Sequence, residues 1–457
     1  MVKQNFVLYI FLICTTYAVS QENKKLVLSL PDCEKLAFEN NLTIQDARLS
    51  LKTSEAKLTQ ASHAKFLPKF EVKNIWGTLP RARGKMDPTG SFVISPDSIT
   101  SIPGDLRLFT QVDLDLIQPI YTFGKLSGIA KAASYGVKAD QAKIEKERES
   151  VRLQVRQLYW ALVLGKELLS VVENADNELK KAEDKIQEKL DEGSDEISQT
   201  DLFKLKIFRY EVDKRKRQTV DKIKLTKSVL KVTLGLADDV EIEPATEYLD
   251  PLDFHLDSLS VYYEMALQNR AELSQLRAGI NARRAMITVS KSDYFPQFFF
   301  GGQIKYNYAQ DRFDPKGPFI YNPTNYFRPG VALGMNLNLN FLQTRDKVRV
   351  AQMEFRQLAQ KEKLLIDGLK LEVEKSYLEL QQAERNMRAS RRALKASDNW
   401  LRSATMTFDI GVGEVKELID AFKANGAMQA EHLQNIFTYN IAMAKLSKAT
   451  GRDLYAK

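Results

Sequence analysis

The sequence predicts an α+β membrane protein in which one helix–strand–strand–helix–helix module is used twice. Two observations predict this class. In each half of the chain, a strand with one apolar and one polar face leads directly into a very long helix, and both halves repeat the same order of elements. Because one chain supplies only four such strands, a membrane barrel built from them has to be shared between several chains.

The amino terminus reads as a secretory signal. Lys3 gives a positive start, residues 6–14 form an apolar run, and Ala18-Val19-Ser20 is a small-residue cleavage pattern. We therefore predict a signal peptide over residues 1–20, because the alternative, a membrane anchor, requires a longer apolar run. Cleavage would leave Cys33 as the single cysteine, which excludes an intrachain disulfide and indicates a packed helix residue.

Charge and hydropathy restrict the partners. The formal net charge is +8, but basic and acidic residues alternate along the predicted helices, which indicates solvated helix faces and no nucleic-acid partner. After the signal, no run reaches the roughly 18 apolar residues of a membrane helix. If the mature chain spans a membrane, it must therefore do so with strands.

The first repeat is predicted over residues 21–235. Leu106, Leu108, Val112, Leu114 and Leu116 alternate with polar residues, as in a strand with one apolar face. A proline-free helix then covers 125–192, about 100 Å at ~1.5 Å per residue, and a return helix covers 196–234. Before the strand we expect a helix over 31–65, a strand over 69–76 and a polar loop over 77–104.

The second repeat is predicted over residues 259–457, after an acidic linker at 236–258 that contains no Lys or Arg. Residues 265–269 repeat the pattern of 36–40, and residues 420–423 repeat that of 201–204. Its strands alternate over 298–308 and 331–341, with aromatic residues near their ends. This pattern is typical of a transmembrane barrel, and a soluble β-sandwich edge is the alternative. Four strands per chain allow any assembly whose strand number is a multiple of four.

The long helix of the second half carries a seam in which large and small residues alternate at steps of seven. This spacing predicts knobs-into-holes packing. An ordinary two-helix coiled coil would not explain the apolar residues on the opposite face, which suggest neighbours on two sides. The large seam residues are Leu380, Met387, Leu394, Leu401 and Phe408, the small ones are Ser376, Ala383, Ser390, Ser397 and Ala404, and the opposite face carries Leu371, Leu378, Ala389 and Ala396.

These features together resemble the TolC-like outer-membrane efflux proteins over nearly all of the mature chain. The signal peptide, the duplicated module, the acidic linker and the turn at 408–421 carry the resemblance. It implies a homotrimer with a 12-stranded β-barrel in the outer membrane and a 12-helix barrel in the periplasm. Such a trimer is a passive exit duct of a tripartite efflux or type I secretion system. Its partners would be outer-membrane lipid, a periplasmic adaptor protein and an inner-membrane transporter.

The resemblance also implies functional residues. Glu417 and Asp420 match the acidic ring that constricts the pore, where carboxylates attract cations; the alternative is two solvated carboxylates on a helix surface. In the first half, Gln199 stands at the acidic position with Asp201 nearby. Phe408 and Gly413 stand where the best-studied member has a tyrosine and an arginine. The expected adaptor contacts at the tip turns are Gly193, Ser194, Asp195, Gly411, Val412 and Gly413.

No enzymatic chemistry is expected. The histidines, His63, His255 and His432, are far apart and lack metal-ligand spacing, and no nucleophile elbow or phosphate-binding loop is present. We therefore expect no catalytic site, metal or cofactor. The competing hypothesis is a soluble periplasmic coiled-coil scaffold or adaptor without a pore, for which the four alternating strands would be unnecessary.

Overall fold

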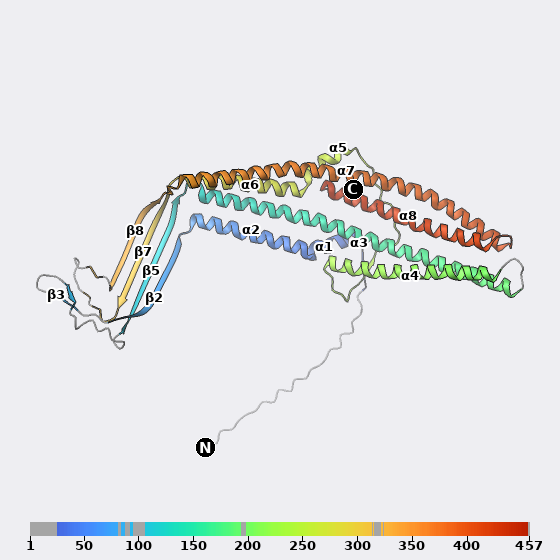
Figure 1. Ribbon diagram of the computed structural model, residues 1–457, viewed down its shortest axis with the longest axis horizontal. Coiled ribbons are helices and arrows are strands. Elements are labelled where there is room, and N and C mark those ends of the chain that lie inside the picture. Colours follow the sequence, from blue (N-terminus) through green and yellow to red (C-terminus); the bar gives the residue numbers. More distant parts are fainter. Residues whose placement is uncertain are drawn as a thin grey trace, which may run out of the picture.

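A computed structural model describes residues 25–455, except 81–83, 87–91, 95–105, 193–197, 313, 315–320 and 323. The molecule is elongated, with a β-sheet at one end and helices that run from it to two tips (Figure 1). The signal peptide expected at 1–20 lies outside the described residues. Among the described residues, no helix combines the length and hydrophobicity that crossing a membrane would require.

Both halves contain the same succession of main elements, two helices, two strands, a long helix and a shorter return helix. The first half consists of α1 (Leu30–Asn40), α2 (Leu42–Phe66), β2 (Lys69–Pro80), β5 (Leu106–Tyr121), α3 (Lys125–Asp191) and α4 (Gln199–Leu234). The second half consists of α5 (Leu259–Asn269), α6 (Ala271–Ser292), β7 (Gln297–Ala309), β8 (Tyr326–Asn336), α7 (Phe341–Asp409) and α8 (Val415–Thr450). The short strands are β1 (Lys25–Leu28), β3 (Gly84–Met86), β4 (Phe92–Ile94) and β6 (Glu241–Pro244).

The main sheet has the order β2-β5-β7-β8, and every neighbouring pair is antiparallel. One row across it is apolar and consists of Val72, Leu114, Ile304 and Pro329. The next row is charged and consists of Lys73, Asp113, Lys305 and Arg328. The sheet therefore has one apolar and one polar face, as the alternation predicted.

The apolar face of this sheet is exposed in the single chain. Trp76 and Leu333 are each 78% exposed, and Val331 is 77% exposed. Two predicted strand limits were wrong. The strand predicted over 331–341 ends at Asn336, because Phe341 already begins α7. The loop predicted over 77–104 contains the end of β2 and the antiparallel pair β3–β4.

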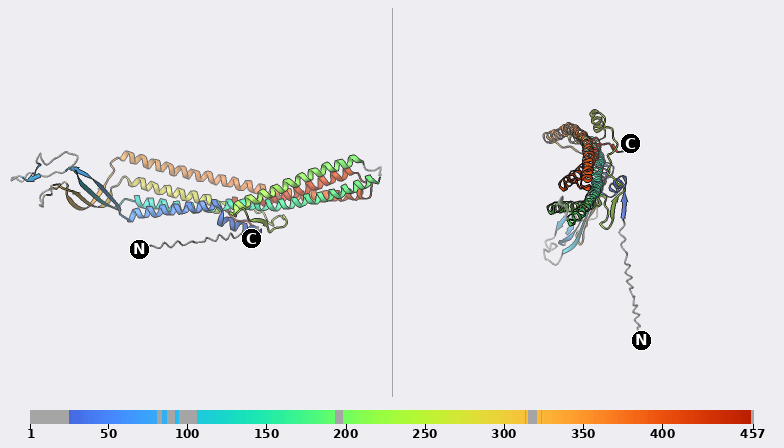
Figure 2. Two further views of the ribbon diagram at one scale, coloured as in Figure 1. Left: turned by 90° about the horizontal axis from the view of Figure 1, so that it is seen from below. Right: turned by 90° about the vertical axis from the view of Figure 1, so that its right-hand side faces the viewer.

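The helices form a single curved layer, which is visible end-on (Figure 2). Next to the sheet, α2 packs on α3, α3 on α6, and α6 on α7. Toward the tips, α4 packs on α3, α3 on α8, and α8 on α7. One edge of the layer is therefore formed by α2 and α4, and the other edge by α7 along its whole length (Figure 1).

The prediction of one helix over 31–65 was wrong, because the chain breaks at Asn41 between α1 and α2. The Asn41 side chain accepts from the Thr43 amide at 3.0 Å and donates to the Thr233 carbonyl at 3.0 Å. It thus caps α2 and the end of α4 together. In the second half, Arg270 lies between α5 and α6 and donates to the Lys448 carbonyl, at the end of α8.

The return helices of the two halves also end alike. Gly235 and Gly451, with φ of +66° and +67°, follow α4 and α8. A Cβ at Gly235 would lie 2.7 Å from Asn40, and one at Gly451 would lie 2.9 Å from Asn269. A glycine is therefore required at both sites by the positive φ and by the close approach of the neighbouring helix end.

The two halves meet at a buried arginine on α3. The Arg156 guanidinium donates to Glu34 at 2.7 Å and to Asp453 at 2.9 Å, and it lies 3.7 Å from the centre of the Tyr455 ring. The segment predicted as a linker at 236–258 contributes β6, which pairs in parallel with β1. Cys33 is buried nearby, and this burial, with the Asp32 and Glu34 charges, raises the pKa of its thiol to about 12.

The seam predicted on the second long helix is present in α7. Its small residues Ser376, Ala383, Ser390, Ser397 and Ala404 are all buried, as are Leu380 and Phe408. The remaining large seam residues, Met387, Leu394 and Leu401, are partly buried. On the opposite face, Leu371 and Leu378 remain 67% and 52% exposed.

Candidate functional site at the helical tip

The turn from α7 to α8 is a regular helix stop. The Gly411 amide donates to the Phe408 carbonyl at 3.1 Å, and the Val412 amide donates to the Thr407 carbonyl at 3.1 Å. These two bonds form a Schellman motif, which needs a left-handed residue at Gly411, where φ is +85°. The end of α7 therefore requires a glycine at position 411. The matching turn with Gly193, Ser194 and Asp195 lies outside the described residues.

The turn packs tightly on its own helix while presenting apolar side chains to solvent. A Cβ at Gly413 would lie 2.7 Å from the Phe408 nitrogen and 2.8 Å from the Thr407 carbonyl carbon. Ile410 and Val412 are 75% and 76% exposed. An apolar surface held by a rigid turn at the end of the molecule is suited to contact with another protein.

Glu417 and Asp420 lie on the exposed face of the first turns of α8, three residues apart. The opposite face buries Val415, Leu418 and Ile419 in the tip core, which fixes the direction of both carboxylates. In the described part of the chain, no basic side chain lies within ion-pair distance of either one. Each is a free carboxylate in a single chain, and a ring would arise only from several copies.

The first-half tip uses its acidic residue differently. Asp201 accepts from the Ser198 hydroxyl at 2.7 Å and pairs with Lys204 at 3.0 Å. The hydrogen bond from Ser198 is the main cause that lowers the pKa of Asp201. Asp201 is thus the capping-box residue of α4, and its Ser-x-x-Asp spacing was a signal that the sequence reasoning missed.

Cross-contacts between the two tips were also missed, because exposed polar residues give no periodic signal. Lys185 on α3 pairs with Asp409 at the end of α7 at 2.7 Å. Lys189 lies 5.5 Å from the centre of the Phe408 ring. Phe408 itself is 3% exposed, so this aromatic residue acts as part of the tip core.

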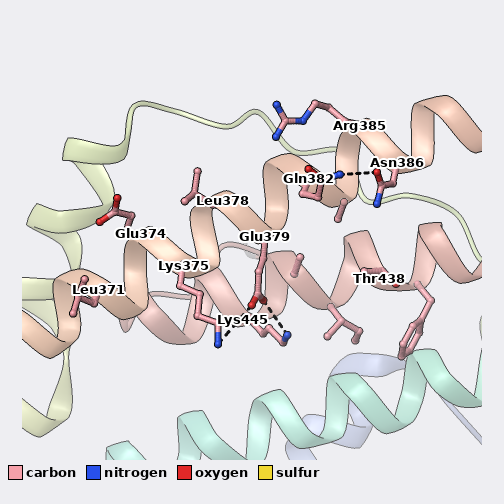
Figure 3. Close-up of a pocket in the computed structure, with 14 residues that line it drawn as sticks. Leu371, Glu374, Lys375, Leu378, Glu379, Gln382, Arg385, Asn386, Thr438 and Lys445 are labelled. Carbon is pink, nitrogen blue, oxygen red and sulfur yellow. Dashed lines mark hydrogen bonds and ion pairs between the residues drawn. The ribbon is translucent and has the colours of Figure 1, made fainter.

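A hollow of about 930 Å³ lies between α7 and α8, farther from the tip than Glu417 and Asp420 (Figure 3). Its wall includes the exposed Leu371 and Leu378, and Glu379 lies 3.0 Å from Lys445 across it. The charged groups on the rim are ion-paired or solvated. The hollow therefore offers an apolar floor with a charged rim, which suits packing against a protein surface.

Residues 262–452 match the outer membrane efflux protein family. No curated protein matches the chain. The fold is similar to that of the Campylobacter jejuni CmeC outer membrane channel, with 16% sequence identity and a TM-score of 0.70 over 94% of this chain and 86% of that one. It is also similar to that of the Neisseria gonorrhoeae MtrE outer membrane channel in its open state, with 14% identity and a TM-score of 0.71 over 93% of this chain and 89% of that one. A third similar structure is that of the Vibrio cholerae outer membrane protein VceC, with 14% identity and a TM-score of 0.71 over 93% of this chain and 96% of that one.

Proposed function

Because residues 262–452 match the outer membrane efflux protein family, we propose that the chain is a member of this family and a passive outer-membrane channel for efflux. In this function it is a duct and not an enzyme. The sheet lies in the outer membrane, and the helices extend into the periplasm. A homotrimer forms the channel and works with a periplasmic adaptor protein and an inner-membrane transporter.

The observation that carries this proposal is the sheet with an exposed apolar face and two free edges. Its four strands alternate in direction, so the edge strands β2 and β8 run opposite to each other. The β8 edge of one copy can therefore pair with the β2 edge of the next in a continuous antiparallel sheet. Such head-to-tail contacts close into a ring, and three copies give a barrel of 12 strands.

The helical edges support the same ring. Both edges of the curved layer carry exposed apolar side chains, which a single soluble chain would leave in water. On one edge these residues are Leu42 and Leu49 of α2 and Phe203, Ile207, Tyr210, Leu225 and Val232 of α4; on the other they are Val350, Leu364, Leu371, Leu378 and Met406 of α7. A coiled-coil scaffold without a pore has no use for the apolar sheet face, so that alternative is not favoured.

The proposed organisation keeps the two repeats at 21–235 and 259–457, joined by 236–258, after removal of residues 1–20. The matching helix ends at Gly235 and Gly451 support a duplicated module. Each repeat then contributes two barrel strands and a pair of periplasmic helices. In the trimer this gives a 12-helix barrel.

The first experiment is the mass of the full chain, extracted from the outer-membrane fraction in mild detergent. Light scattering corrected for bound detergent should give a trimer. A monomer or dimer in the soluble periplasmic fraction would refute the channel. It would leave the scaffold as the better hypothesis.

Within the channel, Glu417 and Asp420 are the proposed constriction ring, and both tip turns are the proposed adaptor contacts. Replacement of both carboxylates, Glu417→Ala with Asp420→Ala, should lower cation selectivity in bilayer conductance, because the ring would lose its negative charge. Glu431→Ala, which removes an exposed carboxylate farther along α8, is the matched control and should leave selectivity unchanged. Equal selectivity in all three proteins would reject the ring while leaving the channel intact.

A further inference from the structure

The polar face of the main sheet carries two neighbouring rows of opposite charge, each of which crosses β2, β5, β7 and β8. We name them the acidic row and the basic row. The acidic row holds two acids and no base, and the basic row holds three bases and one acid, so their net charges are −2 and +2 per chain. The acidic row consists of Glu71, Asp115, Gln303 and Gly330, and the basic row consists of Lys73, Asp113, Lys305 and Arg328.

The basic row lies farther from the helices than the acidic row. The helix α2 ends at Phe66, and β2 begins at Lys69, so the start of β2 is its helical end. Lys73 follows Glu71 by two residues along this strand, which places the basic row ~7 Å farther out at ~3.4 Å per residue. With the helices in the periplasm, the basic row is therefore the outer one of the two.

The positive charge of the basic row is not neutralised by ion pairs. Among the described residues, no carboxylate lies within ion-pair distance of Lys73, Lys305 or Arg328. Asp113 stands between the two lysines in the register, but it accepts a hydrogen bond from the Gln111 side chain at 2.8 Å. Its other oxygen, Oδ1, is buried and has no hydrogen-bond partner in the described part of the chain.

Arg328 is held in place by neutral groups. Its guanidinium lies 4.3 Å from the centre of the Tyr321 ring and 4.0 Å from that of the Tyr326 ring. It donates to the Tyr321 hydroxyl at 3.1 Å and to the Asn322 carbonyl at 2.7 Å. A guanidinium has five N–H donors, so donors remain for a further acceptor. The two rings fix the orientation of the guanidinium while its full charge is kept.

The proposed barrel turns both rows into closed belts. Its apolar face meets lipid, so its polar face lines the lumen, and three copies give belts with net charges of −6 and +6. Twelve strands ~4.8 Å apart, tilted by ~40°, leave the axis about 12 Å from the backbone. Lysine and arginine side chains extend into this space, so their charges lie within about a Debye length, ~8 Å, of the axis. An ion in the lumen cannot avoid the field of either belt.

We propose that the basic belt is a binding site for multivalent anions, such as those with several phosphate groups, in the outer part of the barrel. The inference rests on the proposed function, which supplies the closed barrel. Positive charge focused in a narrow lumen raises the local concentration of anions, and the arginine fork matches phosphate oxygens. The acidic belt lies directly behind and repels the same anion. An anion that enters from outside is thus attracted and then stopped at the basic belt, where it obstructs the duct.

The test is block of single-channel conductance by tripolyphosphate. The full-length protein is added to one chamber of a planar bilayer; its long polar helices stay on that side, so the outer mouth opens to the opposite chamber. Tripolyphosphate should block from the opposite chamber at a concentration at least about tenfold lower than from the helical side, where the acidic belt precedes the basic one. Monophosphate should need about tenfold more than tripolyphosphate, because it carries fewer charges to the same belt.

Two variants change the basic belt in opposite directions. Lys73→Gln with Lys305→Gln removes two positive charges per chain, and neither lysine bonds to another described residue, so block should need about tenfold more tripolyphosphate or more. Asp113→Asn removes the negative charge of the row and should lower the blocking concentration about threefold or more.

The matched control is Lys361→Gln with Lys363→Gln, which makes the same charge change at exposed sites on α7. Its block should equal that of the unchanged protein. Equal block from both chambers, equal potency of monophosphate, or unaltered block in the lysine variant of the belt would each overturn the inference. The trimer mass and the unblocked conductance are measured on the same preparations. A conducting trimer that tripolyphosphate does not block rejects the anion site alone, whereas a protein that forms no trimer and no pore rejects the proposed function.

Discussion

A single buried arginine joins the two halves of the chain at the level of the residue. The Arg156 side chain is only 3% exposed, and its partners Glu34 and Asp453 come from opposite ends of the sequence. Burying such charges is costly, and the arrangement is stable only while every partner is present. Arg156 therefore ties the C-terminal segment to α1 and α3.

Arg156→Ala should lower the free energy of unfolding by about 3–5 kcal/mol, because Glu34 and Asp453 would remain partly buried without a counter-charge. Urea unfolding of the helical part, followed by circular dichroism, measures this loss. Arg283→Ala is the control, since its ion pair with Glu354 is about half exposed and should be worth no more than ~1 kcal/mol. Equal losses in the two variants would contradict the role of Arg156.

The same cluster predicts a dependence on pH. Burial alone would raise the pKa of Asp453, but the charge of Arg156 and a hydrogen bond from the Tyr455 amide hold it below its ordinary value. A carboxyl whose pKa is lowered in the folded state adds stability above its ordinary pKa, and this is lost as the pH falls through the lowered value. Between about pH 5 and pH 2 the native protein should therefore lose more stability than Asp453→Asn. Equal losses of stability in the two proteins over this pH range would contradict the prediction.

At the level of the element, the tip turn depends on a glycine whose φ is unremarkable. Gly413→Ala would push a Cβ against backbone atoms of Phe408 and Thr407. The turn must shift, and amide hydrogen exchange at the end of α7 should become about tenfold faster or more. Gly426→Ala, with open space around its Cβ, is the control and should slightly stabilise α8. Unchanged exchange in Gly413→Ala would show that the turn adapts at no cost.

The elements differed in how much the sequence could predict. Heptad spacing identified the buried face of α7 because packing between helices follows the helical period. The break at Asn41 was missed because α1 and α2 are both good helix formers, and the break depends on a bond to the distant Thr233. The role of Asp201 was local and readable, whereas the pair of Lys185 with Asp409 depends on how two tips meet in space.

At the level of the whole molecule, the proposed ring of copies depends on the free edge of α7. Leu371→Glu with Leu378→Glu would place two charges on that edge, where the ring buries apolar side chains. The trimer fraction measured by light scattering should fall strongly, with the helix content of each chain unchanged. Tyr248→Glu adds a charge at another exposed site outside both edges and should leave the trimer intact. If the double variant still formed the trimer, the contact between copies would not lie on this edge of α7.

The antiparallel order of the sheet has a consequence for mixtures of good and faulty subunits. Every copy in the proposed ring pairs its β8 edge with one neighbour and its β2 edge with the other. A copy with a damaged β8 edge therefore leaves a gap that no other copy can close. In a cell that makes both kinds equally, only about one trimer in eight would consist of intact copies alone. A mutation that damages the β8 edge would thus act dominantly, although half of the subunits are unaltered.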